Sequence, residues 1–144
     1  MEFAPTSIAC LAEPELVAEK LRAGYQRRKA RDVYDLAYFA RRPRNEALVK
    51  KLLLLKLWNV FDRFDYAKFD GQFADKRAYD WDDLYQLIPR ADHEAPDTFL
   101  ARVRNAFSFM KELSEAEQAV SLDSAQRRVE EAQQLLAECL VLAR

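Results

Sequence analysis

The residues best suited to chemistry lie in the stretch 15–36, ELVAEKLRAGYQRRKARDVYDL, where a lysine, a basic run and two carboxylates follow one another. Asp32 and Asp35 are three residues apart, so they share one face of a helix. Lys20 lies one helix earlier and converges on them if the two helices pack as a hairpin. A lysine and carboxylates at such a junction suit a triphosphate and its Mg²⁺, with the lysine as a point charge and an aspartate as metal ligand or base.

The same residues also have a purely structural interpretation. Asp32 is a natural N-cap, and Asp35 at the third helical position would favour the helix dipole without any ligand. The basic residues between 27 and 31 can form a solvated face or pair with those carboxylates. Spacing alone leaves both interpretations open.

The elements that must position these side chains are predicted to be helices. The chain has only two glycines among its 144 residues and is rich in good helix formers, which favours an all-α fold. Apolar residues at 3.6 spacing predict helices over 14–28 and 32–41. Asn45 is a good N-cap for a third helix that reaches Phe64. Because this third helix is apolar almost all round, we expect it to be central.

The remaining elements complete one helical-bundle domain of about six helices. A short helix is predicted between Asp80 and Pro89, and longer ones over 96–113 and 122–143, with a capping box at Ser114 before the last. Phe3–Leu11 has no helical period and is expected to be extended. We therefore expect a single domain over residues 1–144, made of an extended lead-in (1–12), the motif-bearing helices (13–64) and the remaining helices (65–144).

Composition and charge narrow the function classes. Residues 1–60 hold 12 Lys/Arg against 7 Asp/Glu, whereas residues 61–144 hold 11 against 17, so a basic part precedes an acidic one. The basic part can meet the phosphates of a nucleotide or RNA, although solvated helix faces of mixed sign explain the charges equally well. The sequence has no P-loop and no Gly-rich dinucleotide turn, and its only histidine, His93, is predicted to lie at the surface. With no signal peptide, no membrane-spanning stretch and no metal-ligand spacing of its two cysteines, we expect a cytoplasmic protein with reduced thiols.

Residues 15–36 resemble the Glu-Lys-Leu-Arg-Ala…Arg-Asp-hydrophobic-Tyr-Asp-Leu signature of the AbiEii/AbiGii family, the toxin-type nucleotidyltransferases of bacterial toxin–antitoxin and abortive-infection systems. The resemblance implies that Lys20 contacts the nucleotide and that Asp32 and Asp35 form the late acidic motif, which includes a catalytic residue. It makes Arg22 and Arg31 candidates for nucleotide binding, as phosphate or structural partners. It also implies Mg²⁺ as cofactor, an NTP and tRNA as candidate substrates, and an antitoxin as partner.

One part of the family pattern is missing near the start of the chain. The family holds its divalent metal with a Gly-Gly or Gly-Ser turn followed by an Asp-x-Asp pair on a sheet, and neither occurs before Lys20. The resemblance therefore covers the carboxy-terminal half only, and Phe3–Leu11 would adjoin the missing sheet. We expect the helical part of a nucleotidyltransferase, completed by another chain and inactive alone. The alternatives are a stand-alone helical module that binds RNA or a protein partner without catalysis, and a remnant without activity.

Overall fold

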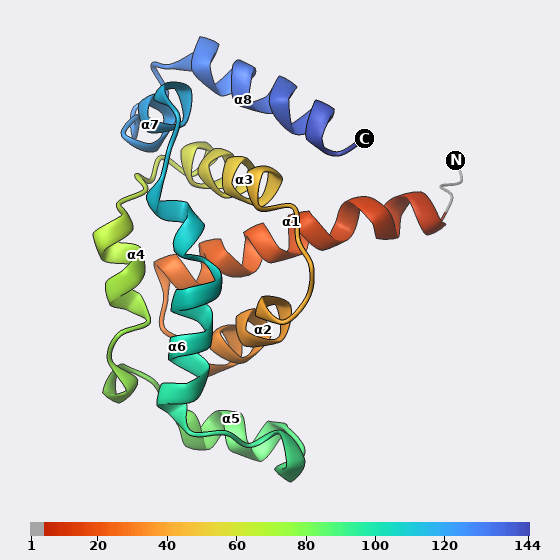
Figure 1. The fold of residues 1–144 in the computed structure, drawn as a ribbon. Helices are drawn as coiled ribbons and strands as arrows, with labels where there is room; N and C mark the ends of the chain where they lie inside the picture. The colour runs from red at the N-terminus through yellow and green to blue at the C-terminus, as the bar shows by residue number, and fades with distance from the viewer. Residues whose placement is uncertain (1–4) are drawn as a thin grey trace.

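The computed structural model describes residues 5–144, with side chains from residue 13 onward. Over these residues the chain forms α-helices and three short 3₁₀ helices and no strand (Figure 1). The all-α prediction is therefore confirmed. The elements are, in order, α1 (Pro5–Gln26), α2 (Ala30–Ala40), α3 (Glu46–Asn59), α4 (Tyr66–Gln72), η1 (Lys76–Ala78), α5 (Trp81–Leu87), η2 (Arg90–Asp92), α6 (Pro96–Ala106), η3 (Ser108–Lys111), α7 (Glu115–Ser121) and α8 (Val129–Leu142).

The first helix is longer than predicted. α1 begins at Pro5 instead of Pro14, so the prediction of an extended segment is wrong for residues 5–11, while Phe3 lies outside the described residues. Since residues 5–144 contain no strand, an extended segment would have no sheet to join, whereas a helix satisfies its own backbone groups. Pro14 stays inside the helix, where it lacks the N–H that would bond one turn back.

α3 is a central helix, as predicted. It packs against α1, α7, α8 and η3. Asn45 is its N-cap, and the Asn45 side chain accepts a hydrogen bond from the backbone N–H of Leu48 at 3.2 Å. Its buried side chains are Leu48, Val49, Leu53, Leu54 and Leu57. Burying one such side chain stabilises the fold by roughly 1.5–3 kcal/mol, so this helix holds the two ends of the molecule together.

The end of α3 differs from the prediction that it reaches Phe64. The helix ends at Asn59, and Phe61 has a φ of 58°, in the left-handed region that a right-handed helix cannot include. The hydroxyl of Tyr25 in α1 donates to the carbonyl of Arg63 at 2.9 Å and accepts from the N–H of Asp65 at 3.0 Å. These tertiary hydrogen bonds hold the chain as it leaves α3, and they are invisible in the local sequence pattern.

α2 lies against α1 on one side and against α6 and α5 on others, so it forms a helical hairpin with α1 (Figure 1). Leu36 of α2 is fully buried, as predicted. Gly24 allows the close approach of the two helices. A Cβ atom at Gly24 would lie 3.0 Å from Cζ of Phe73 and 3.3 Å from Cδ1 of Leu36. The hairpin that the candidate site needs is therefore tightly packed.

The carboxy-terminal part contains a break that was not predicted. The capping box of Ser114 and Glu117 is confirmed at the start of α7, but the helix predicted over 122–143 is α8 alone, beginning at Val129. Gln126, with a φ of 55°, lies between the two helices. The buried residues of α8 are Ala132, Leu135 and Cys139. The apolar pattern of the sequence predicts burial of Ala132 and Cys139, which is confirmed, and also of Ala125, Val129, Leu136 and Leu140, which are exposed.

The described helices include none that is both long and apolar enough to cross a membrane.

Candidate functional site

The junction of α1 and α2 encloses a polar pocket of about 240 Å³. Four cationic side chains and two carboxylates line it, so its walls carry an excess of positive charge. Lys20 comes from α1, and Arg27 and Lys29 come from the loop between the two helices. Arg31, Asp32 and Asp35 come from the first two turns of α2.

Lys20 and Asp35 meet across the helical hairpin. Nζ of Lys20 lies 2.7 Å from Oδ2 of Asp35, and the two side chains are 29% and 36% exposed. Because both remain partly open to solvent, the pair is accessible to a ligand in the pocket. The structure thus places the lysine of the first helix beside one of the two acids that the sequence analysis selected.

Asp32 occupies a different environment from Asp35. Its side chain is only 4% exposed, and Arg27 donates to it from Nε at 2.8 Å and from Nη2 at 3.2 Å. Two charge-assisted hydrogen bonds of this kind satisfy both carboxylate oxygens. Asp32 is also not the N-cap of α2, because the helix begins at Ala30 and its cap is Lys29. The carboxylate lies in the first turn, where it favours the helix dipole.

The two arginines predicted to bind nucleotide are in different places. Arg31 lines the pocket, and its side chain is 58% exposed, with only a 3.9 Å contact to Asp83. Arg22 does not line it. Arg22 donates instead to Glu19 and to Gln26 on the same helix. Of the five predicted site residues, the structure brings all but Arg22 to this pocket.

Two lining residues were missed by sequence reasoning. Arg27 and Lys29 were not among the predicted site residues, although the sequence analysis allowed the basic residues between 27 and 31 to pair with the two carboxylates, as Arg27 does with Asp32. The signal that could have found Arg27 is its spacing from Asp32, since an arginine just before a helix can reach a carboxylate in the first turn. Arg28 does not line the pocket.

The carboxylates of the pocket do not make a divalent-metal site by themselves. A structural or catalytic Mg²⁺ takes oxygen ligands in near-octahedral geometry, but both oxygens of Asp32 already accept from Arg27. Among the residues with described side chains, no cluster of three metal-ligating side chains occurs. The sequence does hold an Asp-x-Asp triplet, Asp80-Trp81-Asp82, but Asp80 there is the N-cap of α5 and accepts from the N–H of Asp83. A metal at this site needs ligands from elsewhere.

Comparisons with known proteins identify the family of the chain. The family model described as "Nucleotidyl transferase AbiEii toxin, Type IV TA system" matches residues 1–136. Among solved structures, the chain is similar to MenT4, a nucleotidyltransferase toxin from Mycobacterium tuberculosis H37Rv, with 31% sequence identity and a TM-score of 0.75. The match covers 88% of this chain and 44% of MenT4, so the chain spans less than half the length of that relative. A search of curated proteins gave no match. Because the family model covers nearly the whole chain, this protein belongs to the AbiEii nucleotidyltransferase toxin family.

Proposed function

We propose that this chain is the helical part of a nucleotidyltransferase of a bacterial toxin–antitoxin system, and that Lys20 and Asp35 contribute to its NTP site. The observation that carries this proposal is the 2.7 Å pair between Lys20 and Asp35 at the polar pocket. Both side chains are about one-third exposed, so a ligand in the pocket can reach the pair and compete for either partner.

The charges of the pocket fit a triphosphate. Its four cations exceed its carboxylates by two, and Lys29 and Arg31 are exposed enough to turn toward phosphate oxygens. When the triphosphate enters, the ammonium group of Lys20 exchanges its carboxylate partner for a phosphate. Asp35 is then released beside the nucleotide, where it can accept the proton of the acceptor hydroxyl as that hydroxyl attacks the α-phosphorus and pyrophosphate leaves.

The two acids have different roles in this proposal. Asp35 contacts the substrate, because it is the partly exposed acid. Asp32 is a positioning residue, because it is buried and holds the guanidinium of Arg27 at the pocket wall through two hydrogen bonds. Arg22 has no direct role, since its guanidinium is occupied by Glu19 and Gln26 outside the pocket.

In our proposal, residues beyond these 144 complete the metal site of the reaction. Asp32 and Asp35 alone do not hold Mg²⁺, and residues 1–136 match a family whose relative MenT4 is more than twice as long as the matched part. A second polypeptide segment, in the same or in another chain, would supply them, and the chain alone would show no nucleotidyl transfer. We further propose an antitoxin partner, a tRNA acceptor and a cytoplasmic location, and the support for these is the toxin family to which the chain belongs.

The test is calorimetric titration of the purified chain with each of the four Mg²⁺–NTP complexes. We expect Lys20→Ala and Asp35→Asn to change NTP affinity at least several-fold, the first downward through the loss of one charge-assisted contact worth about 1.5–3 kcal/mol. The matched control is Lys56→Ala. Lys56 also pairs with carboxylates of α1, at 2.9 Å from Glu15, and its side chain is 26% exposed. If Lys20→Ala and Lys56→Ala bind every NTP as the wild type does, the pocket is not an NTP site.

The alternative function is a helical module that binds RNA without catalysis. The observation in its favour is that two of the pocket cations, Arg27 and Lys29, belong to an exposed basic loop, residues 27–29, which also carries Arg28. It predicts RNA binding with a steep salt dependence that Lys20→Ala and Asp35→Asn leave unchanged, together with no NTP binding.

A further inference from the structure

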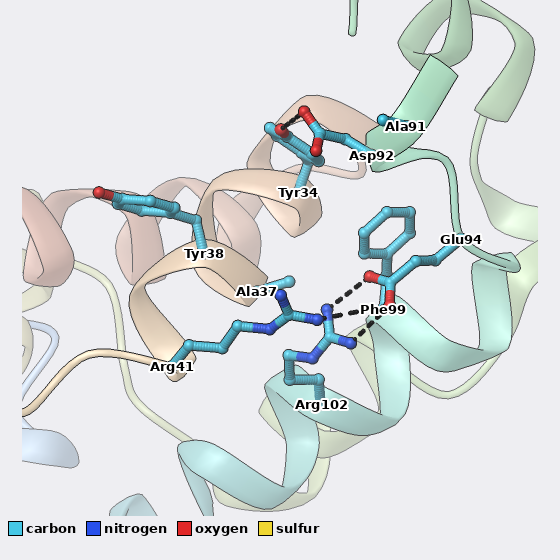
Figure 2. A pocket seen from close by; sticks show the side chains of 9 residues that line it. All are labelled: Tyr34, Ala37, Tyr38, Arg41, Ala91, Asp92, Glu94, Phe99 and Arg102. Atoms are coloured by element: carbon cyan, nitrogen blue, oxygen red, sulfur yellow. Dashed lines mark hydrogen bonds and ion pairs between the residues drawn. The ribbon is translucent and has the colours of Figure 1, made fainter. Parts of the chain in front are cut away.

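A second pocket, of about 220 Å³, lies on the next face of α2, between that helix, the segment around η2 and α6. Ala37 and Phe99 form its apolar floor, and both are buried (Figure 2). The ring of Tyr34 stands edge-on to Phe99, with 5.8 Å between the ring centroids and an interplanar angle of 72°. The pocket therefore combines a flat apolar base with an aromatic wall.

One side of this pocket offers hydrogen-bond donors. Arg102 donates to both oxygens of Glu94, at 2.8 and 2.9 Å, whereas Arg41 reaches the same carboxylate only at 3.4 Å. Two guanidinium groups thus share one carboxylate, as Figure 2 shows. The Arg41 side chain is 63% exposed, so most of its donors face solvent and the pocket mouth. This arrangement holds Arg102 in place and leaves Arg41 in a longer and more exposed pair, which an anion in the pocket can replace.

The opposite side of the pocket offers an acceptor. Asp92 accepts only a long hydrogen bond of 3.4 Å from the hydroxyl of Tyr34. At the edge of the pocket the ring of Tyr38, a residue that is 56% exposed, is turned away from the paired arginines. The cation beside this ring is Arg42, whose Cζ lies 5.8 Å from the ring centroid, and an exposed aromatic ring with arginines nearby is typical of surfaces that stack bases and hold the phosphates between them.

These features together select a nucleotide as ligand. A purely apolar ligand would leave the exposed donors of Arg41 and the weakly bonded carboxylate of Asp92 unused, and a simple anion would use neither the apolar floor nor the acceptor. A nucleobase carries donors and acceptors on its edge and has an apolar face, and its phosphate is an anion. The face of the base then matches the apolar floor, its edge matches the acceptor, and the phosphate matches the arginine donors.

The position of the pocket along α2 indicates which place in a strand the bound nucleotide would have. Tyr34 precedes Asp35 in the sequence, and Tyr38 follows Asp35 by three residues, which is a rise of about 4.5 Å along α2. We infer that this pocket binds a nucleotide near the end of the single strand that accepts the transferred nucleotide, while the strand's terminus lies at Asp35. This inference rests on the proposed function, because it takes the Lys20–Asp35 pocket to be the NTP site.

The experiment measures binding of fluorescein-labelled single strands of about twelve nucleotides, one of RNA and one of DNA, to the 144-residue chain by fluorescence anisotropy at several salt concentrations. We expect Tyr38→Ala to weaken binding at least fivefold and Tyr38→Phe to leave it unchanged, because stacking needs the ring and not the hydroxyl. Arg41→Ala should weaken binding and lower the slope of log K against log salt by about 0.7. The RNA and DNA arms show which kind of strand is preferred.

The control is Arg104→Ala, which makes the same charge change on α6. Arg104 is 42% exposed and pairs with Asp70, and it does not line the pocket. The inference is overturned if the wild type binds neither strand, if Tyr38→Ala binds like the wild type, or if Arg41→Ala and Arg104→Ala weaken binding equally. Thermal melts of the variants show that each is folded. Failure of the proposed function is seen separately, in NTP titrations of Lys20→Ala, which do not involve this pocket.

Discussion

The ion pair between Arg27 and Asp32 leads to a prediction about both the stability of the fold and the affinity for NTP. Asp32 is 4% exposed and Arg27 is 58% exposed, so Arg27→Ala leaves a nearly buried carboxylate without either of its two hydrogen bonds. A buried polar group without a partner costs about 1–3 kcal/mol, and a fully buried ion pair costs more to break. Because solvent screens the exposed guanidinium, we expect Arg27→Ala to lower the free energy of unfolding by about 2 kcal/mol. For a chain of this size, the melting temperature falls by about 6 °C.

The stability of a double variant, in which Asp32→Asn is added to Arg27→Ala, tests whether the unpaired carboxylate is the cause of this loss. Asp32→Asn removes the buried charge and keeps the shape of the side chain. In the wild type this substitution removes a favourable pair and destabilises. In the Arg27→Ala background it removes an unpaired charge, so Arg27→Ala/Asp32→Asn should be more stable than Arg27→Ala alone. Urea unfolding followed by circular dichroism measures all four free energies.

The same four proteins test the positioning role of Asp32. If Asp32 acts on the nucleotide through Arg27, Asp32→Asn weakens NTP binding in the wild type and has no further effect once Arg27 is alanine. The reasoning is refuted if the double variant loses stability by the sum of the two single losses. It is equally refuted if Asp32→Asn lowers NTP affinity by the same factor in both backgrounds, because Asp32 would then contact the nucleotide directly.

Two further predictions concern the packing that holds the site. Gly24→Ala should destabilise the fold by about 1 kcal/mol, because its Cβ would lie 3.0 Å from Phe73. Gly71→Ala should stabilise it slightly through helix propensity, because nothing lies within 4 Å of the added Cβ. Chemical denaturation compares the two variants, and equal effects would contradict the close-packing argument. Burial alone would raise the pKa of Glu117, but the hydrogen bond from Lys51 and other favourable contacts hold it below the usual 4.5. The stability that comes from this lowered pKa is present above pH 4.5 and is lost as pH falls through the folded-state pKa. Glu117→Gln should therefore reduce the loss of stability between pH 7 and about pH 3. An unchanged dependence of stability on pH would contradict this role of Glu117.

The sequence predicted the helical hairpin and its candidate residues because both depend on local signals. Three-residue spacing places Asp32 and Asp35 on one face of any helix that contains them. It did not predict which acid is free. α2 begins at Ala30, two residues earlier than expected, so Asp32 lies within the first turn and meets Arg27 instead of capping the helix. The pairing depends on where the preceding loop directs one side chain, and spacing carries no such information.

Helix ends were likewise predicted where the signal is local and missed where it is not. The caps at Asn45 and Ser114 were predicted because each is a local hydrogen bond between a side chain and a nearby N–H. The end of α3 and the start of α8 were not, because Phe61 and Gln126 adopt left-handed backbone conformations that residues of their types rarely favour. Contacts with distant parts of the chain, such as the hydroxyl of Tyr25 with Asp65, hold one of these turns.

The sequence by itself determined the helical class and the signature of residues 15–36, since helix propensity, apolar period and motif spacing all act within a few turns. Only the tertiary structure decided that Lys20 pairs with Asp35, that Asp32 is occupied by Arg27, and that Tyr34, Arg41 and Asp92 surround a second pocket. These pairings depend on how α1, α2 and α6 are rotated against one another. That rotation is set by the packing of the whole core, in which each buried side chain must fit its neighbours.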